Sequence, residues 1–252
     1  MDDESVVPTT IKEPNHRAVA EKLTRAIEEG RHEMPESPEP LVCKPRQLES
    51  WRVFKIMSEF VEGFELIQKY GLAASVFGTA RCGFDDEVYQ SATELSARLA
   101  KSGYAIITGG SAGVMEAANK GAYDAGGASI GLNIELPHEQ NENGYLTESQ
   151  TFHHFFVRKV MLTFASEVYI YFPGGFGTLD EFTEILTLVQ TKKIKRVPIV
   201  LYGKDYWSPL ITFFENDLFK KHHAIDEADL ELYKVVDSVD DAYDYIIKTV
   251  RC

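Results

Sequence analysis

The chain has 252 residues, and its 44% hydrophobic and 26% charged content is typical of a soluble globular protein with a sizeable core. A formal net charge of -13 repels the phosphate backbones of DNA and RNA, so nucleic-acid polymers are poor candidates for partners. The cysteines, Cys43, Cys82 and Cys252, fit neither a disulfide framework nor a zinc site, and no apolar run is long enough to cross a membrane. With no signal peptide at the acidic N-terminus, these features predict a cytoplasmic protein.

The first 47 residues differ in composition from the rest of the chain. Six of the ten prolines lie in residues 1–45, several of them alternating with acidic residues and serine, a pattern typical of irregular structure. Between the irregular stretches, His16–Glu29 can form a short helix that Gly30 ends. We therefore expect residues 1–47 to form a helical, partly irregular arm that can pack on a partner subunit, and residues 48–252 to form a single domain.

Helical spacing of apolar residues predicts a helix over residues 48–69, and strands then alternate with helices. The predicted strands are Ala73–Phe77, Tyr104–Thr108, Ala128–Leu136, Val168–Phe172 and Val197–Tyr202. The predicted helices are Asp86–Lys101, Ala112–Ala125, Thr178–Thr191, Asp205–Lys220 and Asp240–Val250. This alternation predicts an α/β fold with a doubly wound, mostly parallel sheet and helices on both faces. Ligands of such sheets bind beyond the carboxyl ends of the strands, where the glycine-rich turns of this sequence fall.

One of these turns, Pro173–Glu181, reads Pro-Gly-Gly-Phe-Gly-Thr-Leu-Asp-Glu and joins a predicted strand to a helix. Its glycines let backbone N–H groups approach a ligand closely, and the helix start adds unpaired N–H groups and a positive dipole end. The pattern predicts a phosphate site, from which Asp180 should point away. Two alternatives are a tight turn without a ligand and a capping box, in which Thr178 and Glu181 only satisfy the helix start.

Two further turns, Gly78–Arg81 and Thr108–Gly113, follow predicted strands and could line the same cleft, with Arg81 within reach of a phosphate. On the helix after Pro173–Glu181, the residues Glu181, Glu184 and Thr187 recur at three-residue spacing. Two carboxylates at the mouth of a glycine-rich turn are candidates for acid–base chemistry or for binding sugar hydroxyls.

The basic pair Arg158 and Lys159 lies in the apolar segment Thr151–Phe164. A basic pair on a helix is usually a solvated edge. Because apolar residues flank this pair on both sides, one cation could instead be held at the edge of the core and aimed at an anion. His153 and His154 precede the pair without other metal ligands at useful spacing, so we expect them to be structural.

Together these motifs resemble the LOG ("Lonely Guy") family of cytokinin riboside 5′-monophosphate phosphoribohydrolases, once described as lysine decarboxylases. The family pattern PGGxGTxxE matches Pro173–Glu181, and its RK pair matches Arg158 and Lys159. Its GGG-type turn before a Met-Glu helix is Gly109-Gly110-Ser111 here, so serine replaces the third glycine. The resemblance covers roughly residues 73–202, and the arm and the C-terminal extension are typical of a long-form member.

The resemblance implies a Rossmann-like fold, homodimers or hexamers, and hydrolysis of the N-glycosidic bond of a nucleoside 5′-monophosphate. The substrate would be an AMP-like or cytokinin riboside monophosphate, and the products free base and ribose 5-phosphate. It also implies that Arg158 and Glu181 are the catalytic pair. The residues that it implies for binding the substrate and its phosphate are Arg81, Gly109, Gly110, Lys159, Gly174, Gly175, Phe176, Gly177, Thr178, Glu184 and Thr187.

The residue chemistry suits this reaction. Breaking a glycosidic bond builds positive charge on the ribose, and the Glu181 carboxylate can stabilise that charge or activate water. Arg158 could hold the phosphate or assist the departing base. No metal or redox cofactor is needed, whereas a decarboxylase would need a pyridoxal phosphate site, for which the motif region offers only Lys159. The alternatives are a carrier of a nucleotide or of the molybdenum cofactor, which does not need Glu181, and a scaffold without a ligand.

Overall fold

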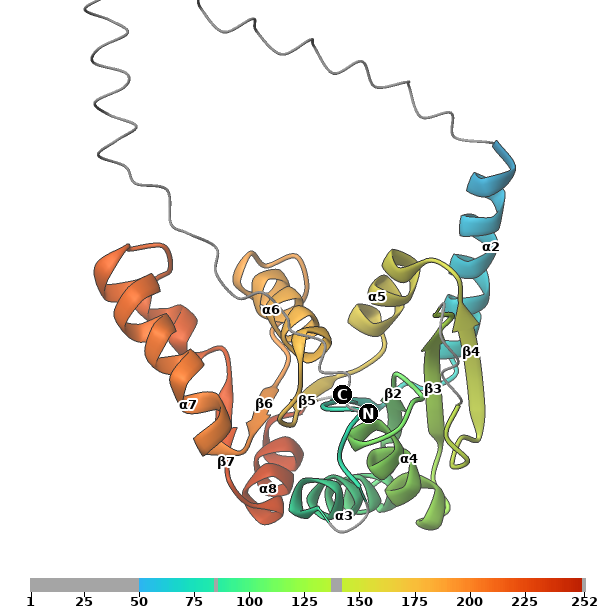
Figure 1. Ribbon diagram of the computed structural model, residues 1–252, viewed down its shortest axis with the longest axis horizontal. Coiled ribbons are helices and arrows are strands. Elements are labelled where there is room, and N and C mark those ends of the chain that lie inside the picture. The colour runs from blue at the N-terminus through green and yellow to red at the C-terminus, as the bar shows by residue number, and fades with distance from the viewer. Residues whose placement is uncertain (1–49, 84–85, 137–141, 251–252) are drawn as a thin grey trace, which may run out of the picture. The chain divides into compact units, whose positions relative to one another are not determined.

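A computed structural model describes residues 50–83, 86–136 and 142–250 (Figure 1). The predicted arm over residues 1–47, including its helix at His16–Glu29, lies outside these residues. Within the described part of the chain, seven parallel strands form one sheet in the order β4-β3-β2-β1-β5-β6-β7. The strands are β1 (Ala73–Phe77), β2 (Ala105–Thr108), β3 (Ser129–Ile134), β4 (Glu148–Phe152), β5 (Val168–Tyr171), β6 (Ile199–Tyr202) and β7 (Lys234–Val236).

The strand order reverses between β1 and β5. The chain runs outward from β1 through β2 and β3 to β4, returns to pair β5 with β1, and continues to β6 and β7. Phe77 at the end of β1 is in register with Tyr171 at the end of β5, so both strands end at the same level. The predicted doubly wound α/β fold is confirmed, and in such sheets this switch point is the usual ligand site.

Helices cover both faces of the sheet (Figure 1). One layer contains α3 (Glu87–Lys101), α4 (Val114–Asp124) and α8 (Val239–Thr249). The other layer contains α2 (Ser50–Ile67), α5 (Phe155–Phe164), α6 (Phe176–Gln190) and α7 (Lys204–Phe213). Successive strand residues enter opposite cores, so that Val76 packs in the α3 layer and Phe77 in the α6 layer. The central strands are therefore buried on both faces, which holds the turns at their carboxyl ends in place.

The two strands that the sequence did not predict, β4 and β7, are the edges of the sheet. In β4 only Phe152 is buried, and in the three residues of β7 only Val236 is buried. An edge strand with solvated side chains lacks the apolar run that reveals a central strand. The predicted helix Asp205–Lys220 is likewise two segments, α7 and a π-helical stretch over Phe214–Lys221.

Helices α3 and α4 approach each other closely at Gly121. A Cβ at this position would overlap the carbonyl oxygen of Thr93 and lie 3.0 Å from the backbone nitrogen of Ala97. We expect Gly121→Ala to lower the free energy of unfolding by about 2 kcal/mol, because overpacking outweighs the gain in helix propensity. Chemical denaturation measures this change. The control is Gly71→Ala, since no atom in the described part of the chain lies within 4 Å of that Cβ position, and equal stability of the two variants would contradict the close approach.

Helix α2 buries only one side of its apolar surface. Gly63, Leu66 and Ile67 are buried against the domain. The other side exposes apolar side chains. Phe164 of α5 extends this exposed surface, since its ring is 59% exposed and lies 6.2 Å from the ring of Phe64. We call this surface the α2–α5 apolar face, and it consists of Trp51, Val53, Phe54, Met57, Val61, Phe64 and Phe164. Contiguous exposed apolar surface is typical of interaction sites.

Candidate active site

A cavity of about 810 Å³ lies at the carboxyl ends of β1 and β5. Three turns that follow strands line it, namely Gly78–Arg81 after β1, Gly109 after β2 and Pro173–Thr178 after β5. The sequence predicted that these turns could share one cleft, and the structure brings them together. Helices and strand ends add the remaining lining residues, which are Phe77, Met115, Ile134, Leu136, Phe155, Arg158, Glu181 and Tyr206.

The turn after β5 leaves open space in front of its backbone. A Cβ on Gly174 would lie 2.7 Å from the Cβ of Thr178, so this position requires glycine. No atom of the described residues lies within 4 Å of the Cβ positions of Gly175 and Gly177, although both residues line the cavity. The first N–H groups of a helix have no partner within the helix, and α6 begins at Phe176. The turn therefore offers backbone donors to open space, which suits an anion.

The capping-box alternative for this turn is wrong. The N-cap of α6 is Gly175, with no side-chain hydrogen bond, and the N–H of Thr178 donates to the Gly175 carbonyl at 3.0 Å. Thr178 is thus three residues inside the helix, and a capping box would need it at the N-cap. Glu181 is consequently not engaged in capping and is available to the cavity.

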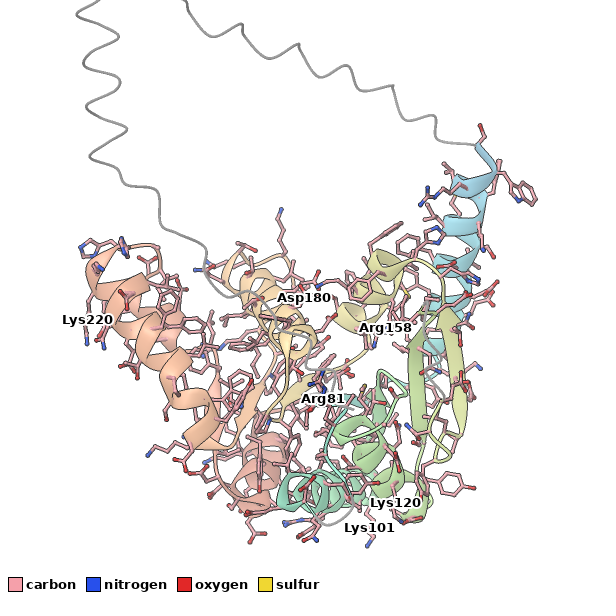
Figure 2. All side chains as sticks on the ribbon, in the orientation of Figure 1. Arg81, Lys101, Lys120, Arg158, Asp180 and Lys220 are labelled. Carbon is pink, nitrogen blue, oxygen red and sulfur yellow. The ribbon has the colours of Figure 1, made fainter. Side chains whose placement is uncertain are left out.

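Arg158 projects from α5 into the cavity, while Arg81 reaches it from the turn after β1 (Figure 2). The Nε of Arg158 donates to the Leu132 carbonyl at 2.7 Å, which ties the guanidinium to β3. A side chain at position 109 would collide with Nη2 of Arg158, so Gly109 makes room for the guanidinium. Burial lowers the pKa of Arg158, and the charge of Glu181 offsets part of that effect. Arg158 is therefore a cation held at the core edge, and not a solvated one.

Glu181 is a buried carboxyl group with 5% of the residue exposed. Burial raises the pKa of Glu181 to about 7, with Glu184 and Asp180 adding to the effect and Lys159 and Arg158 opposing it. A carboxyl group with a pKa near neutrality can be used in either protonation state at physiological pH. Such a group beside a cation and a row of backbone donors is suited to acid–base work on a bound anion.

Lys159 faces the acidic side of α6 and does not line the cavity. Its Nζ lies 2.5 Å from Asp180, 3.1 Å from Glu184 and 3.9 Å from Glu181. Burial opposes its charge, but these carboxylates outweigh burial and raise the pKa of Lys159. Asp180 pairs with Lys159 and lies outside the cavity lining, in line with the expectation that it points away from a bound phosphate.

Four predicted binding residues lie outside the cavity lining: Gly110, Lys159, Glu184 and Thr187. Gly110 has a left-handed φ of 72° and its Cβ position lies 2.7 Å from the side-chain Cγ of Asn133, so it shapes the turn behind Gly109. Thr187 is exposed and donates to the Thr183 carbonyl at 2.7 Å. Lys159 and Glu184 form an ion pair with each other at 3.1 Å.

Some lining residues were not predicted from the sequence. Tyr206 comes from α7 and its hydroxyl donates to the Gly174 carbonyl, which latches the glycine turn from the far side. No local motif marks this residue, because it reaches the site from the helix after β6. Phe155 and Met115 did carry a signal, since Phe155 lies one helical turn before Arg158 and Met115 follows the second glycine turn.

Neither a metal site nor a membrane span is found in the described ranges. Residues 50–83, 86–136 and 142–250 contain no group of three or more His, Cys, Asp or Glu side chains placed to hold a metal ion. In the same part of the chain, no helix combines the length and the apolar character that crossing a membrane requires.

Solved structures with a similar fold include two proteins that bind the molybdenum cofactor. The molybdenum cofactor binding protein of Rippkaea orientalis aligns with a TM-score of 0.54 and 20% identity, over 71% of this chain and 96% of that one. The molybdenum cofactor carrier protein of Chlamydomonas reinhardtii aligns with a TM-score of 0.53 and 25% identity, over 71% of this chain and 97% of that one. The first of these likenesses shows the fold alone.

Curated relatives share sequence over about half of the chain. The cytokinin riboside 5′-monophosphate phosphoribohydrolase of Rhodococcoides fascians is 29% identical over 57% of this chain and 74% of the relative. The probable cytokinin riboside 5′-monophosphate phosphoribohydrolase LOGL5 of Oryza sativa subsp. japonica is 30% identical over 50% of this chain and 52% of the relative. The family model described as "Possible lysine decarboxylase" matches residues 115–246, more than half of the chain. The chain therefore belongs to this family, the LOG family, as its glycine turn and RK pair predicted.

Proposed function

We propose that this protein hydrolyses the N-glycosidic bond of nucleoside 5′-monophosphates and releases the free base and ribose 5-phosphate. The observation that carries the proposal is the meeting of three groups in one cavity: the open glycine turn, the tethered Arg158 and the buried Glu181. The names of the curated relatives support the same reaction class.

Each group has a role in the proposed reaction. The phosphate binds the N–H groups at Gly175–Gly177, with Arg81 also lining the cavity. The Glu181 carboxylate takes a proton from water, whose oxygen bonds to the ribose carbon as the bond to the base nitrogen breaks. The electrons of that bond leave with the base, which takes up one proton while Glu181 releases the proton that it took from water, and Arg158 stabilises the charge that develops on the leaving side. The products account for one nucleotide and one water.

The apolar side of the cavity suits a purine base. Met115, Ile134, Leu136 and Phe155 line it, and two of them, Leu136 and Phe155, are 46% and 48% exposed. Flat aromatic bases gain affinity from such side chains through apolar burial and stacking. We accordingly propose AMP-like or cytokinin riboside monophosphates as substrates.

The proposal is tested with a panel of nucleoside monophosphates that includes AMP and isopentenyladenosine monophosphate. Purified protein is incubated with each compound, and chromatography measures free base and ribose 5-phosphate in equal amounts. The matched nucleosides without phosphate should be poor substrates, because they lack the group that the glycine turn binds. If no monophosphate yields free base, the hydrolase proposal fails.

A second candidate is a carrier that holds a nucleotide or the molybdenum cofactor without cleaving it. The 25% identity to the Chlamydomonas reinhardtii carrier protein favours it, since a carrier can use the same glycine turn. A carrier does not need a buried carboxyl group at the cavity. Binding of AMP or of molybdenum cofactor without any released base would support the carrier and exclude the hydrolase.

We also propose that the protein is a homo-oligomer, a dimer or hexamer, joined through the α2–α5 apolar face. Trp51 is 78% exposed in the single subunit, and the proposed interface would bury it. Trp51→Asp places a charge there and should raise the subunit dissociation constant roughly 100-fold. Light scattering after gel filtration measures the mass. Ile247→Asp is the control, since Ile247 is 42% exposed on α8, in the opposite layer. A monomeric parent protein, or an unchanged mass in Trp51→Asp, would contradict the proposal.

A further inference from the structure

A buried carboxylate lies outside the cavity and outside the matched family region. Glu59 of α2 is 5% exposed, and it precedes the region 115–246 that the family model matches. Its Oε2 accepts the backbone N–H of His154 at 3.1 Å, and its Oε1 lies 3.0 Å from Nδ1 of His154 and 3.6 Å from Nδ1 of His153. Burying a carboxylate is costly unless it is fully paired, so this arrangement needs a reason.

The contacts of Glu59 fall at the start of the helix that carries Arg158. His154 is the N-cap of α5, and its own side chain makes no capping hydrogen bond. The Glu59 carboxylate supplies an acceptor and a negative charge at this end, both of which stabilise a helix start. The His154 carbonyl in turn accepts the N–H groups of Val157 and Arg158 at 3.0 and 3.3 Å. Fixing His154 thereby fixes the turn from which Arg158 projects.

Two contacts then fix the position of Arg158. The Leu132 carbonyl holds its Nε at 2.7 Å, and Glu59 holds the backbone from which the side chain starts. Close packing seats α2 for this task, since a Cβ on Gly63 would lie 2.7 Å from Cγ of Met161 on α5. We propose that Glu59 is a positioning residue, which places Arg158 in the cavity by anchoring the start of α5. The proposal rests on the proposed function in that Arg158 acts on the bound nucleotide.

The test compares three variants of α2. Glu59→Ala should lower kcat on AMP on the order of 10-fold to 100-fold with little change in KM, because small displacements of a catalytic group cost that much. Glu59→Gln keeps an acceptor for the His154 N–H and should recover most of the rate. Glu62→Ala is the control, since Glu62 is an exposed carboxylate one turn further along α2 and, among the described residues, accepts hydrogen bonds from Ser58 and Gln150. Rates are measured well below each variant's Tm, so that lost stability alone does not lower them.

A second measurement does not depend on activity. Amide hydrogen exchange in the first turn of α5 should speed up in Glu59→Ala and stay unchanged in Glu62→Ala. If the parent protein releases no base, this measurement still decides whether Glu59 anchors α5, and the proposed function fails separately. If Glu59→Ala does not fold, Glu59→Asp, which keeps the charge and shortens its reach, takes its place. A kcat within about twofold of the parent in a folded variant, with unchanged exchange, overturns the proposal.

Discussion

Replacing Glu181 by glutamine should lower base release from AMP by about 1000-fold or more, while the affinity for AMP changes only a few-fold. Glutamine has the same size and hydrogen-bonding reach, but it can neither take a proton from water nor carry a negative charge toward the ribose. Burial has already removed most water from the Glu181 carboxyl group, so no solvent group replaces it. Calorimetric titration measures AMP affinity, and single-turnover assays measure the chemical step.

Thr183→Val is a matched control for Glu181→Gln on the same helix. Thr183 is exposed and lies outside the cavity lining, and its hydroxyl donates to the carbonyls of Leu179 and Asp180. It should leave both rate and affinity unchanged. Full turnover in Glu181→Gln would remove Glu181 from the reaction, and loss of AMP binding along with turnover would give it a binding role instead.

The pH dependence follows from the same carboxyl group. Burial raises the pKa of Glu181 to about 7, so the reactive carboxylate is scarce below that pH and abundant above it. We expect kcat/KM to rise with pH through about 7, far above the usual range of a glutamate, and this limb to be absent from the residual activity of Glu181→Gln. A profile that instead falls through the same pH would assign Glu181 the role of proton donor to the base.

The raised pKa of Glu181 also predicts how the free energy of unfolding changes with pH. Between the ordinary glutamate pKa and about 7, the folded protein binds this proton and the unfolded chain has lost it. The contribution of Glu181 to the free energy of unfolding therefore falls as pH rises through this window. Glu181→Gln removes the cost of a buried charge, so its Tm should exceed that of the parent at pH 8 and match it at pH 4. An equal difference at both pH values would mean that burial does not perturb Glu181.

The sequence predicted that the glycine turns could line one cleft because each turn is a local motif that follows a strand. The turn Pro173–Glu181, the Gly109 turn and Arg81 each follow a strand, and parallel strands bring their carboxyl ends to one edge. Their convergence thus required only the correct fold class. The central strands were predicted for a related reason, since burial on both faces demands continuous apolar runs.

Some residues that the resemblance implied for binding lie outside the cavity lining, for geometric reasons. Thr187 lies six residues beyond Glu181, which is about 9 Å along a helix axis and out of reach of the turn. Glu184 lies nearer but faces Lys159, so the three-residue spacing identified a shared side of the helix and not shared access to the cavity. Tyr206 reaches the Gly174 carbonyl from a distant helix, and such a contact depends on the packing of α7, which no local pattern encodes.

Helix α2 is a second case in which a local pattern predicted the element but not its contacts. Its apolar spacing predicted a helix, and the helix is present over Ser50–Ile67. Periodicity reports which residues share a side but not what covers that side. Trp51 and Phe54 are exposed, whereas Glu59, on the same helix, is buried against the start of α5. The exposure of the apolar side and the burial of Glu59 both depend on contacts of α2 with other elements, so the sequence of the helix alone does not predict them.

Arg158→Ala should lower kcat/KM for AMP by about 100-fold to 1000-fold, because the variant loses a cation that the Leu132 carbonyl holds in place at the cavity. Arg158→Lys should recover only part of this loss. The parent arginine bonds the Leu132 carbonyl through Nε and keeps its terminal nitrogens for other partners, and the single ammonium of lysine cannot do both. Steady-state kinetics on the three proteins measure the series.

Arg196→Ala provides the matched control for Arg158→Ala. Arg196 is exposed, also donates to a backbone carbonyl, that of Glu231 at 2.7 Å, and lies outside the cavity lining. The decisive readout is the pH profile. Arg158 lowers the pKa of Glu181, so without it the rising limb of the kcat/KM profile should move above pH 7. If Arg158→Ala is slower but its kcat/KM still rises at the same pH as in the parent, Arg158 does not affect the ionisation of Glu181. The arginine would then act on the phosphate alone.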